Sequence, residues 1–269
     1  MKKVHLVLGS GGARGLAHIG VIEAMEEQGF QICAVTGSSI GAVVGGMYCS
    51  GHLQDYKNWL LTLSKTSVLR LFDLTITTKG FVKGQKVYNR LKSFTGNRNI
   101  EEFAIPFTAV ATNITNNAEV YFTSGDLYTA LRASTAIPGM FTPVNMDGQL
   151  LVDGAVLNPL PLNTIEPEPD VLVVAVCLNG YTPSKKNEAS NAKPKHPGLI
   201  DLLNISYDFT QQRLIQLMIE KHQPDILVQV PRDVCGGFEF HRAQEVIEVG
   251  RQVFMQSLAA QKSNLLKVG

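Results

Sequence analysis

Apolar and polar positions near the N-terminus follow two different periods. Residues 4–8 form a continuous apolar run that predicts a short buried strand, and Gly9 ends it. Apolar residues then recur at helical spacing over residues 18–25. Gly29 follows this stretch, and a glycine commonly lies just past a helix end. The pattern therefore predicts a strand, a glycine-rich turn and a helix.

The same order is repeated immediately. Residues 32–35 predict a second strand, a glycine turn follows, and residues 40–49 form a helix of mainly small and apolar side chains. Two strand–turn–helix units within fifty residues indicate βαβ connections and a parallel sheet.

The middle of the chain predicts helices and then hairpins. Residues 52–91 are mainly helical in pattern, with a looser centre near residues 73–84. Strands at 107–113 and 119–123 flank an Asn-Asn pair, which is typical of a hairpin turn. A second hairpin is predicted around Asp147 and Gly148.

A further helix is expected between these two hairpins. It covers residues 126–134, with Ser124 as the candidate N-cap and Pro138 as the stop signal.

The C-terminal part contains the strongest strand signal. The β-branched run at 171–178 predicts a central strand that is buried on both faces. The polar, proline-punctuated residues 180–197 predict a mobile loop. An apolar-rich helix at 199–221, a strand at 226–230 and a closing helix at 243–258 follow.

Composition agrees with one globular domain. Of 269 residues, 45% are apolar and 17% are charged, which excludes a disordered chain. We find no internal repeat and no second core. We therefore expect a single α/β domain over 1–269, with its core at about 4–255, built as a three-layer α/β/α sandwich around a mainly parallel sheet.

Charge and cysteine content narrow the range of partners. The net charge of +1 gives no electrostatic footprint for nucleic acid. Four scattered cysteines without a Cys-x-x-Cys pair indicate reduced core thiols, so we expect no metal site. The N-terminal run is short for a signal peptide, and no run reaches the roughly 18 apolar residues of a membrane span. We expect a soluble, cytoplasmic protein, with peripheral contact to a membrane surface left open.

The glycine-rich turn at 9–15 has three interpretations. It can be a structural turn, a dinucleotide-phosphate loop or an oxyanion hole, because the last two both use free N–H groups at a helix start. The dinucleotide pattern fails, since its third glycine falls on Arg14. No Gly-Lys-Ser/Thr follows, so the turn is not a P-loop.

The second turn contains a nucleophile signature. Gly37-Ser38-Ser39-Ile40-Gly41 is a Gly-x-Ser-x-Gly sequence between a predicted strand and a predicted helix. This spacing places a serine hydroxyl on a sharp turn, and the flanking glycines relieve the crowding. Ser39 is central, so it is the candidate nucleophile and Ser38 the rival. The alternative is that Ser39 only caps the next helix.

A base for this serine is harder to find among the histidines. The histidines are His5, His18, His52, His196, His222 and His241. His5 and His18 lie in the first strand and an early helix, where local packing is the simplest interpretation, and His196 lies in the polar loop. His222 and His241 come late enough in the chain, but neither lies in a tight turn after a clear sheet strand, so a Ser–His–Asp triad is not supported. Asp153 instead ends a strand-like run and precedes Gly154, where the chain leaves the sheet. Asp147, by contrast, lies in a predicted hairpin turn, which indicates a structural role.

Taken together, three motifs resemble those of the patatin-like phospholipase family. They are the glycine turn at 10–15, the serine turn at 37–41 and Asp153-Gly154-Ala155, in the family's order, with supporting stretches at 15–21 and 132–139. The resemblance covers roughly residues 4–255 and is closest to bacterial single-domain members.

The resemblance implies a serine acyl-ester hydrolase acting on lipids through a Ser39–Asp153 dyad without a catalytic histidine, metal or cofactor. An acyl-enzyme would form on Ser39, and burial should raise the proton affinity of Asp153. The expected oxyanion donors are the N–H groups of Gly11, Gly12 and Ala13, with Arg14 supporting the loop or the charge. Ser10 stands where a glycine is usual, which leaves the geometry of the hole open.

Several alternatives remain at this level. Residues 182–221 are either a core-packing helix with its loop or a lid with a lipid-facing surface. A catalytically silent scaffold and a nucleotide-binding regulator are the rival functions. The head group, acyl length, ester position and oligomeric state are not given by the sequence.

Overall fold

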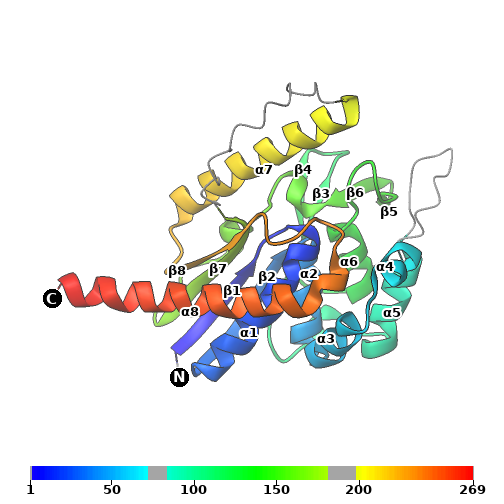
Figure 1. Cartoon of the computed structure of the whole chain (residues 1–269). Coiled ribbons are helices and arrows are strands. Elements are labelled where there is room, and N and C mark those ends of the chain that lie inside the picture. Colours follow the sequence, from blue (N-terminus) through cyan, green and yellow to red (C-terminus); the bar gives the residue numbers. More distant parts are fainter. Residues whose placement is uncertain (1, 72–83, 181–197, 269) are drawn as a thin grey trace, which may run out of the picture.

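The computed structural model describes residues 2–71, 84–180 and 198–268 (Figure 1). In this part of the chain, eight strands form one sheet in the order β5-β6-β3-β2-β1-β7-β8, with β4 also paired to β3. The strands are β1 (Lys2–Leu8), β2 (Phe30–Ser38), β3 (Phe107–Asn113), β4 (Ala118–Phe122), β5 (Val144–Met146), β6 (Gln149–Asp153), β7 (Val171–Gly180) and β8 (Ile226–Pro231).

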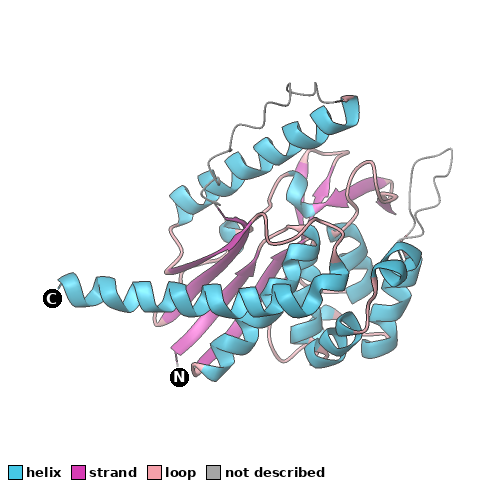
Figure 2. Ribbon diagram, viewed as in Figure 1, coloured by secondary structure: helices cyan, strands magenta, loops and turns pink. Residues whose placement is uncertain are grey.

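Helices cover both faces of this sheet, as Figure 2 shows. The helices are α1 (Ala17–Glu27), α2 (Ile40–Cys49), α3 (Leu53–Leu61), α4 (Lys65–Leu71), α5 (Gln85–Thr95), α6 (Leu127–Ser134), α7 (Leu199–His222) and α8 (Ala243–Val268). Short 3₁₀ turns include η1 (Gly12–Leu16), η3 (Gly154–Val156) and η5 (Phe240–Arg242).

Side chains along β1 and β7 point alternately to the two faces of the sheet, and each face carries its own hydrophobic cluster. Leu6 and Val176 belong to the large core that includes side chains of α1, α2 and α8. Val7 and Ala175 point to the opposite face, where they share a smaller cluster with Ile215 of α7. The predicted three-layer α/β/α architecture is therefore confirmed, as is the central position of the 171–178 strand between β1 and β8.

Most strands pair in parallel, and the predicted hairpins supply the antiparallel part. The pairings β1–β2, β1–β7, β2–β3 and β7–β8 are parallel. β3–β4 and β5–β6 are the two hairpins. Asp147 and Gly148 have φ values of 50° and 79°, the left-handed pair that a tight hairpin turn requires.

Two expectations change in detail, and two others fall on residues outside the described part of the chain. Asp126, rather than Ser124, caps α6, because it directly precedes the helix and its carboxylate accepts the Thr129 N–H. β2 runs on to Ser38 instead of stopping at residue 35. The loop expected at 180–197 lies outside the described residues apart from Gly180, and so does most of the looser centre at 73–84.

The register of β3 brings two strand ends together. β4 occupies one edge of β3 over Ala109–Asn113, so β2 and β6 must share the other edge. On that edge Ser38 of β2 is opposite Val110, and Asp153 of β6 is opposite Ala111. Because β2 is parallel and β6 antiparallel to β3, their C-terminal ends meet head to head.

Glycines allow α1 and α8 to pack closely. A β-carbon at Gly20 would lie 1.9 Å from the carbonyl oxygen of Ile247, and one at Gly250 would lie 2.0 Å from that of Ala17. Both contacts are with backbone, which cannot rotate away. The two helices could keep this spacing only with glycine at both positions.

We expect Gly250→Ala to lower the free energy of unfolding by about 1–3 kcal/mol, because the added methyl group must push α1 and α8 apart. Urea denaturation measures the change. Glu248→Ala, on the exposed side of α8, is the control and should stay within about 0.5 kcal/mol. Equal stability of Gly250→Ala and wild type would show that the helices can separate freely.

Candidate active site

Ser39 occupies a strained turn between β2 and α2. Its φ of 56° and ψ of −124° are unusual for a residue with a side chain. A β-carbon at Gly37 would lie 2.4 Å from the Gly41 carbonyl, and one at Gly41 would lie 2.1 Å from the Leu8 carbonyl oxygen. The Gly-x-Ser-x-Gly spacing thus reflects two close backbone approaches.

The Ser39 side chain faces Asp153 and makes no capping hydrogen bond to α2. Its Oγ donates to Asp153 Oδ2 at 2.6 Å. The other carboxylate oxygen, Oδ1, accepts the Ala155 N–H at 2.8 Å. Both side chains are buried, and Asp153 is 1% exposed. The alternative of Ser39 as a helix cap is therefore wrong, and the two candidate residues form a pair.

Burial governs the protonation of this pair. Removal from water raises the pKa of Asp153 to about 7, although the hydrogen bonds from Ser39 and Ala155 lower it in part. This agrees with the expectation that burial increases the proton affinity of Asp153. A carboxylate with a pKa near neutrality is a far stronger base than an exposed aspartate.

The end of α6 and the residues just after it align both members of the pair, and sequence reasoning gave them no role. Ser134 Oγ accepts the backbone N–H of Ser39 at 3.0 Å. Two residues later, the Ala136 carbonyl accepts the N–H of Asp153 at 3.0 Å. Ser134 has no exposed surface. Its position within the 132–139 stretch that carries the family resemblance was the available signal.

The glycine turn presents two free N–H groups beside Ser39. Ser10 and Ala13 donate their N–H groups to Pro159 and Gly237 carbonyls, at 2.9 and 2.8 Å. Within the described part of the chain, the N–H groups of Gly11 and Gly12 have no acceptor. Of the expected oxyanion donors, these two are available, whereas Ala13 is already engaged.

Two ionisable side chains, Arg14 and His18, support the glycine turn. Arg14 Nε donates to the Gly11 carbonyl at 3.0 Å, which holds the turn in place. His18 Nε2 lies 2.9 Å from the Gly9 carbonyl oxygen, and burial lowers its pKa to about 4, so the ring is neutral near pH 7. No histidine lines either cavity at Ser39 among the described residues.

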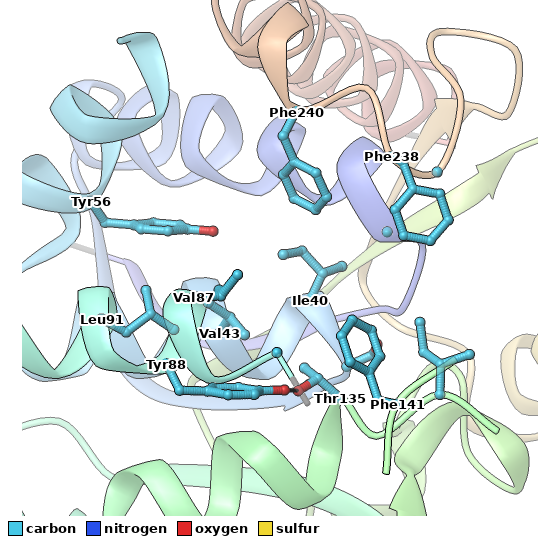
Figure 3. Close-up of a pocket in the computed structure, with 15 residues that line it drawn as sticks. Ile40, Val43, Tyr56, Val87, Tyr88, Leu91, Thr135, Phe141, Phe238 and Phe240 are labelled. Carbon is cyan, nitrogen blue, oxygen red and sulfur yellow. Dashed lines mark hydrogen bonds between the residues drawn. The ribbon is translucent and has the colours of Figure 1, made fainter. Parts of the chain in front are cut away.

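An apolar cavity of about 630 Å³, including its mouth, opens on one side of Ser39. Figure 3 shows Ile40, Val43, Tyr88 and Phe141 around it, with Phe240 closing it from above. The residues come from α2, α3, α5 and two loops. A cavity lined in this way suits a hydrocarbon chain.

Another cavity of similar size lies next to Asp153, and we call it the polar cavity because its lining includes charged and amide side chains that the first cavity lacks. Its lining includes Arg14, Asn179 and, from α7, Tyr207, Asp208 and Gln211. Sequence reasoning named only the first of these as a site residue. The others lie on a strand end and on α7, a helix of polar and apolar residues without a motif.

The helix α7 packs on the sheet and also lines the cavity next to Asp153. Its Ile215 packs on the sheet, as a core helix does. One turn earlier, Gln211 is 5% exposed and its Nε2 donates to the Ala155 carbonyl beside the dyad. α7 therefore packs against the sheet and also walls the polar cavity.

The described residues contain no group of three or more metal-binding side chains. No helix among them is long and apolar enough to cross a membrane.

Comparison with known proteins assigns the chain to the lipid hydrolases. The sequence profile described as patatin-like phospholipase matches residues 6–165, more than half of the chain. The chain therefore belongs to the patatin-like phospholipase family, as the three motifs predicted.

Relatives and a solved structure extend this comparison. An "uncharacterized NTE family protein" of Mycobacterium bovis is 33% identical over 96% of this chain and 92% of its own length. Lysophospholipase NTE1 of Candida albicans is 28% identical over 92% of this chain, which spans 19% of the fungal protein. The crystal structure of VipD from Legionella pneumophila aligns over 97% of this chain and 67% of its own, at 15% identity and a TM-score of 0.47.

We expect Asp153→Asn to stabilise the protein more at pH 8 than at pH 4. The folded state keeps the proton up to about pH 7, whereas an unfolded aspartate loses it near 3.9. The free energy of unfolding of wild type therefore falls as pH rises between these values, by about 1.4 kcal/mol per pH unit. Asparagine removes that dependence.

Urea denaturation of both proteins at several pH values measures this difference. Glu166→Gln, which changes an exposed carboxyl, is the control and should show no such trend. A constant difference between Asp153→Asn and wild type from pH 4 to pH 8 would rule out a raised pKa in the folded protein.

Proposed function

We propose that this protein hydrolyses the acyl esters of lipids through an acyl-enzyme on Ser39, with Asp153 as the general base. The 2.6 Å hydrogen bond between the two side chains carries this proposal. A serine hydroxyl needs a positioned base to attack an ester carbonyl, and Asp153 is the titratable partner within reach.

The reaction takes place in two halves. Asp153 accepts the Ser39 proton as Oγ bonds to the ester carbonyl carbon, and the same proton then passes to the departing alcohol oxygen. A water molecule next gives a proton to Asp153 as its oxygen bonds to the acyl carbon. The bond between the acyl carbon and Oγ then breaks, Asp153 returns the proton to Ser39 Oγ, and the fatty acid is released. Ala155 holds the carboxylate in one orientation throughout.

The glycine turn supplies the electrostatic part. The free N–H groups of Gly11 and Gly12 serve as donors to the tetrahedral oxyanion, and each donor of this kind is worth about 3–4 kcal/mol of barrier. Ala13 can add a third only by giving up the Gly237 carbonyl. Ser10 takes no part through its N–H, which Pro159 binds.

Each of the two cavities binds a different part of the substrate. The apolar cavity beyond Ser39 takes the acyl chain, and the polar cavity with Arg14, Asn179 and Gln211 takes the alcohol side. Lysophospholipids, phospholipids and simpler esters all have this polarity. We infer a cytoplasmic enzyme that contacts a membrane surface transiently, as a lipid substrate would require.

We expect a fluorophosphonate probe to label wild type at Ser39 and to leave Ser39→Ala unlabelled, since only an activated serine reacts. Ser38→Ala is the matched control, because the neighbouring Ser38 hydroxyl is buried and unpaired. Mass spectrometry of the labelled peptide reads the result. Labelling of Ser39→Ala to the wild-type extent would refute the assignment of the nucleophile.

The pH profile tests the base. We expect kcat/KM for lysophosphatidylcholine to fall roughly tenfold per unit below about pH 7, because the protonated carboxyl cannot accept the Ser39 proton. Asp153→Asn should lose nearly all activity at every pH. An Asp153→Asn protein with wild-type kcat/KM would disprove the dyad.

A further inference from the structure

A second apolar cavity adjoins the apolar cavity at Ser39, which we call the first cavity. The second cavity has no part in the reaction described above. It encloses about 280 Å³ when the open space at its mouth is included, and it lies among α3, α4, α5 and η5. Three residues, Tyr56, Val87 and Phe240, line both cavities. The remaining lining is apolar and consists of Trp59, Leu60, Leu63, Val68 and Leu71.

The first cavity lies at Ser39 and the second lies beyond it. The first begins at Ser39 and continues past Val43 and along the turn of α5 that carries Val87 and Leu91. The second begins at the three shared residues, on the side away from Ser39. Because they share these three residues, their linings form one apolar surface that runs from the nucleophile to α3, α4 and α5.

Tyr56 marks the boundary between the cavities. It is 3% exposed and lines both cavities. Figure 3 shows the hydroxyl pointing into the first cavity, toward Ile40 and Phe240. Burial raises its pKa, so the phenol is neutral. A hydroxyl in an otherwise apolar lining makes this boundary sensitive to what lies against it.

We propose that the second cavity receives the distal end of a long, unbranched acyl chain, and that Tyr56, Val87 and Phe240 form the neck through which the chain passes. The inference rests on the proposed function. Short acyl groups fill only the first cavity, whereas long ones gain further apolar contacts beyond the neck. The enzyme is thereby selective for long-chain esters.

Val68 and Leu69 on α4 offer a matched pair of variants. Val68 is 4% exposed and lines the second cavity, whereas Leu69 is 50% exposed. We expect Val68→Phe to lower kcat/KM for a p-nitrophenyl palmitate substrate roughly tenfold or more and to leave the butyrate ester within about twofold. Leu69→Phe should change neither. Unchanged butyrate hydrolysis also shows that Val68→Phe is folded.

Tyr56→Phe tests the neck without filling it. Removing the hydroxyl should raise kcat/KM for palmitate several-fold, since the chain no longer passes a polar group at the neck. A palmitate rate that stays the same in Val68→Phe and in Tyr56→Phe would overturn the proposal.

Direct binding separates this proposal from the proposed function. Calorimetry with palmitate and octanoate needs no turnover, and we expect wild type to bind palmitate more tightly and Val68→Phe to lose that preference. This result without ester hydrolysis would support the cavity and reject the hydrolase. Hydrolysis with the same palmitate preference in Val68→Phe and wild type would support the hydrolase and reject the cavity.

Discussion

The hydrogen bond between Ser39 and Asp153 depends on a sheet in which two strands end against each other. β2 and β6 lie on one edge of β3 and run in opposite directions, so Ser38 and Asp153 come opposite consecutive residues of β3. Residues 114 positions apart are thereby held at 2.6 Å by backbone pairing rather than by a flexible loop. A shift of one residue in the β3–β6 register would turn the Asp153 side chain to the other face of the sheet.

Burial of the carboxylate is the second condition for this chemistry. An aspartate in water is a weak base, and Asp153 becomes a stronger one because α7 and the segment after α6 exclude solvent from it. The same burial destabilises the charged form in the folded state. Such a conflict between stability and reactivity is typical of functional sites, where local structure is retained for its chemistry.

Much of the site could be predicted because its constraints are local. Gly37, Ser39 and Gly41 fit within one turn, and the strand before and the helix after them are visible in the hydrophobic pattern. Asp153 was identified from its strand-end position together with the family resemblance. The fold class followed from the repeated strand–turn–helix order, since parallel strands need helical connections.

The remaining features depend on contacts between distant segments. Ser134 supports the Ser39 N–H, and Gln211 contacts the Ala155 carbonyl, yet neither has a local pattern that sets it apart from other polar helix residues. The engagement of the Ala13 N–H by Gly237 links residues more than two hundred positions apart. The choice of Asp126 over Ser124 as helix cap was settled by which side chain directly precedes the helix.

In the resting site the Ala13 N–H is hydrogen-bonded to the Gly237 carbonyl, which would compete with a substrate oxygen for this donor. A neutral ester carbonyl is no better an acceptor than the amide carbonyl of Gly237, so a bound substrate has little reason to displace it. An oxyanion carries charge and forms a much stronger hydrogen bond. Exchange of partners at Ala13 would therefore accompany charge development, and this donor would distinguish the transition state from the ground state, which is the condition for raising kcat.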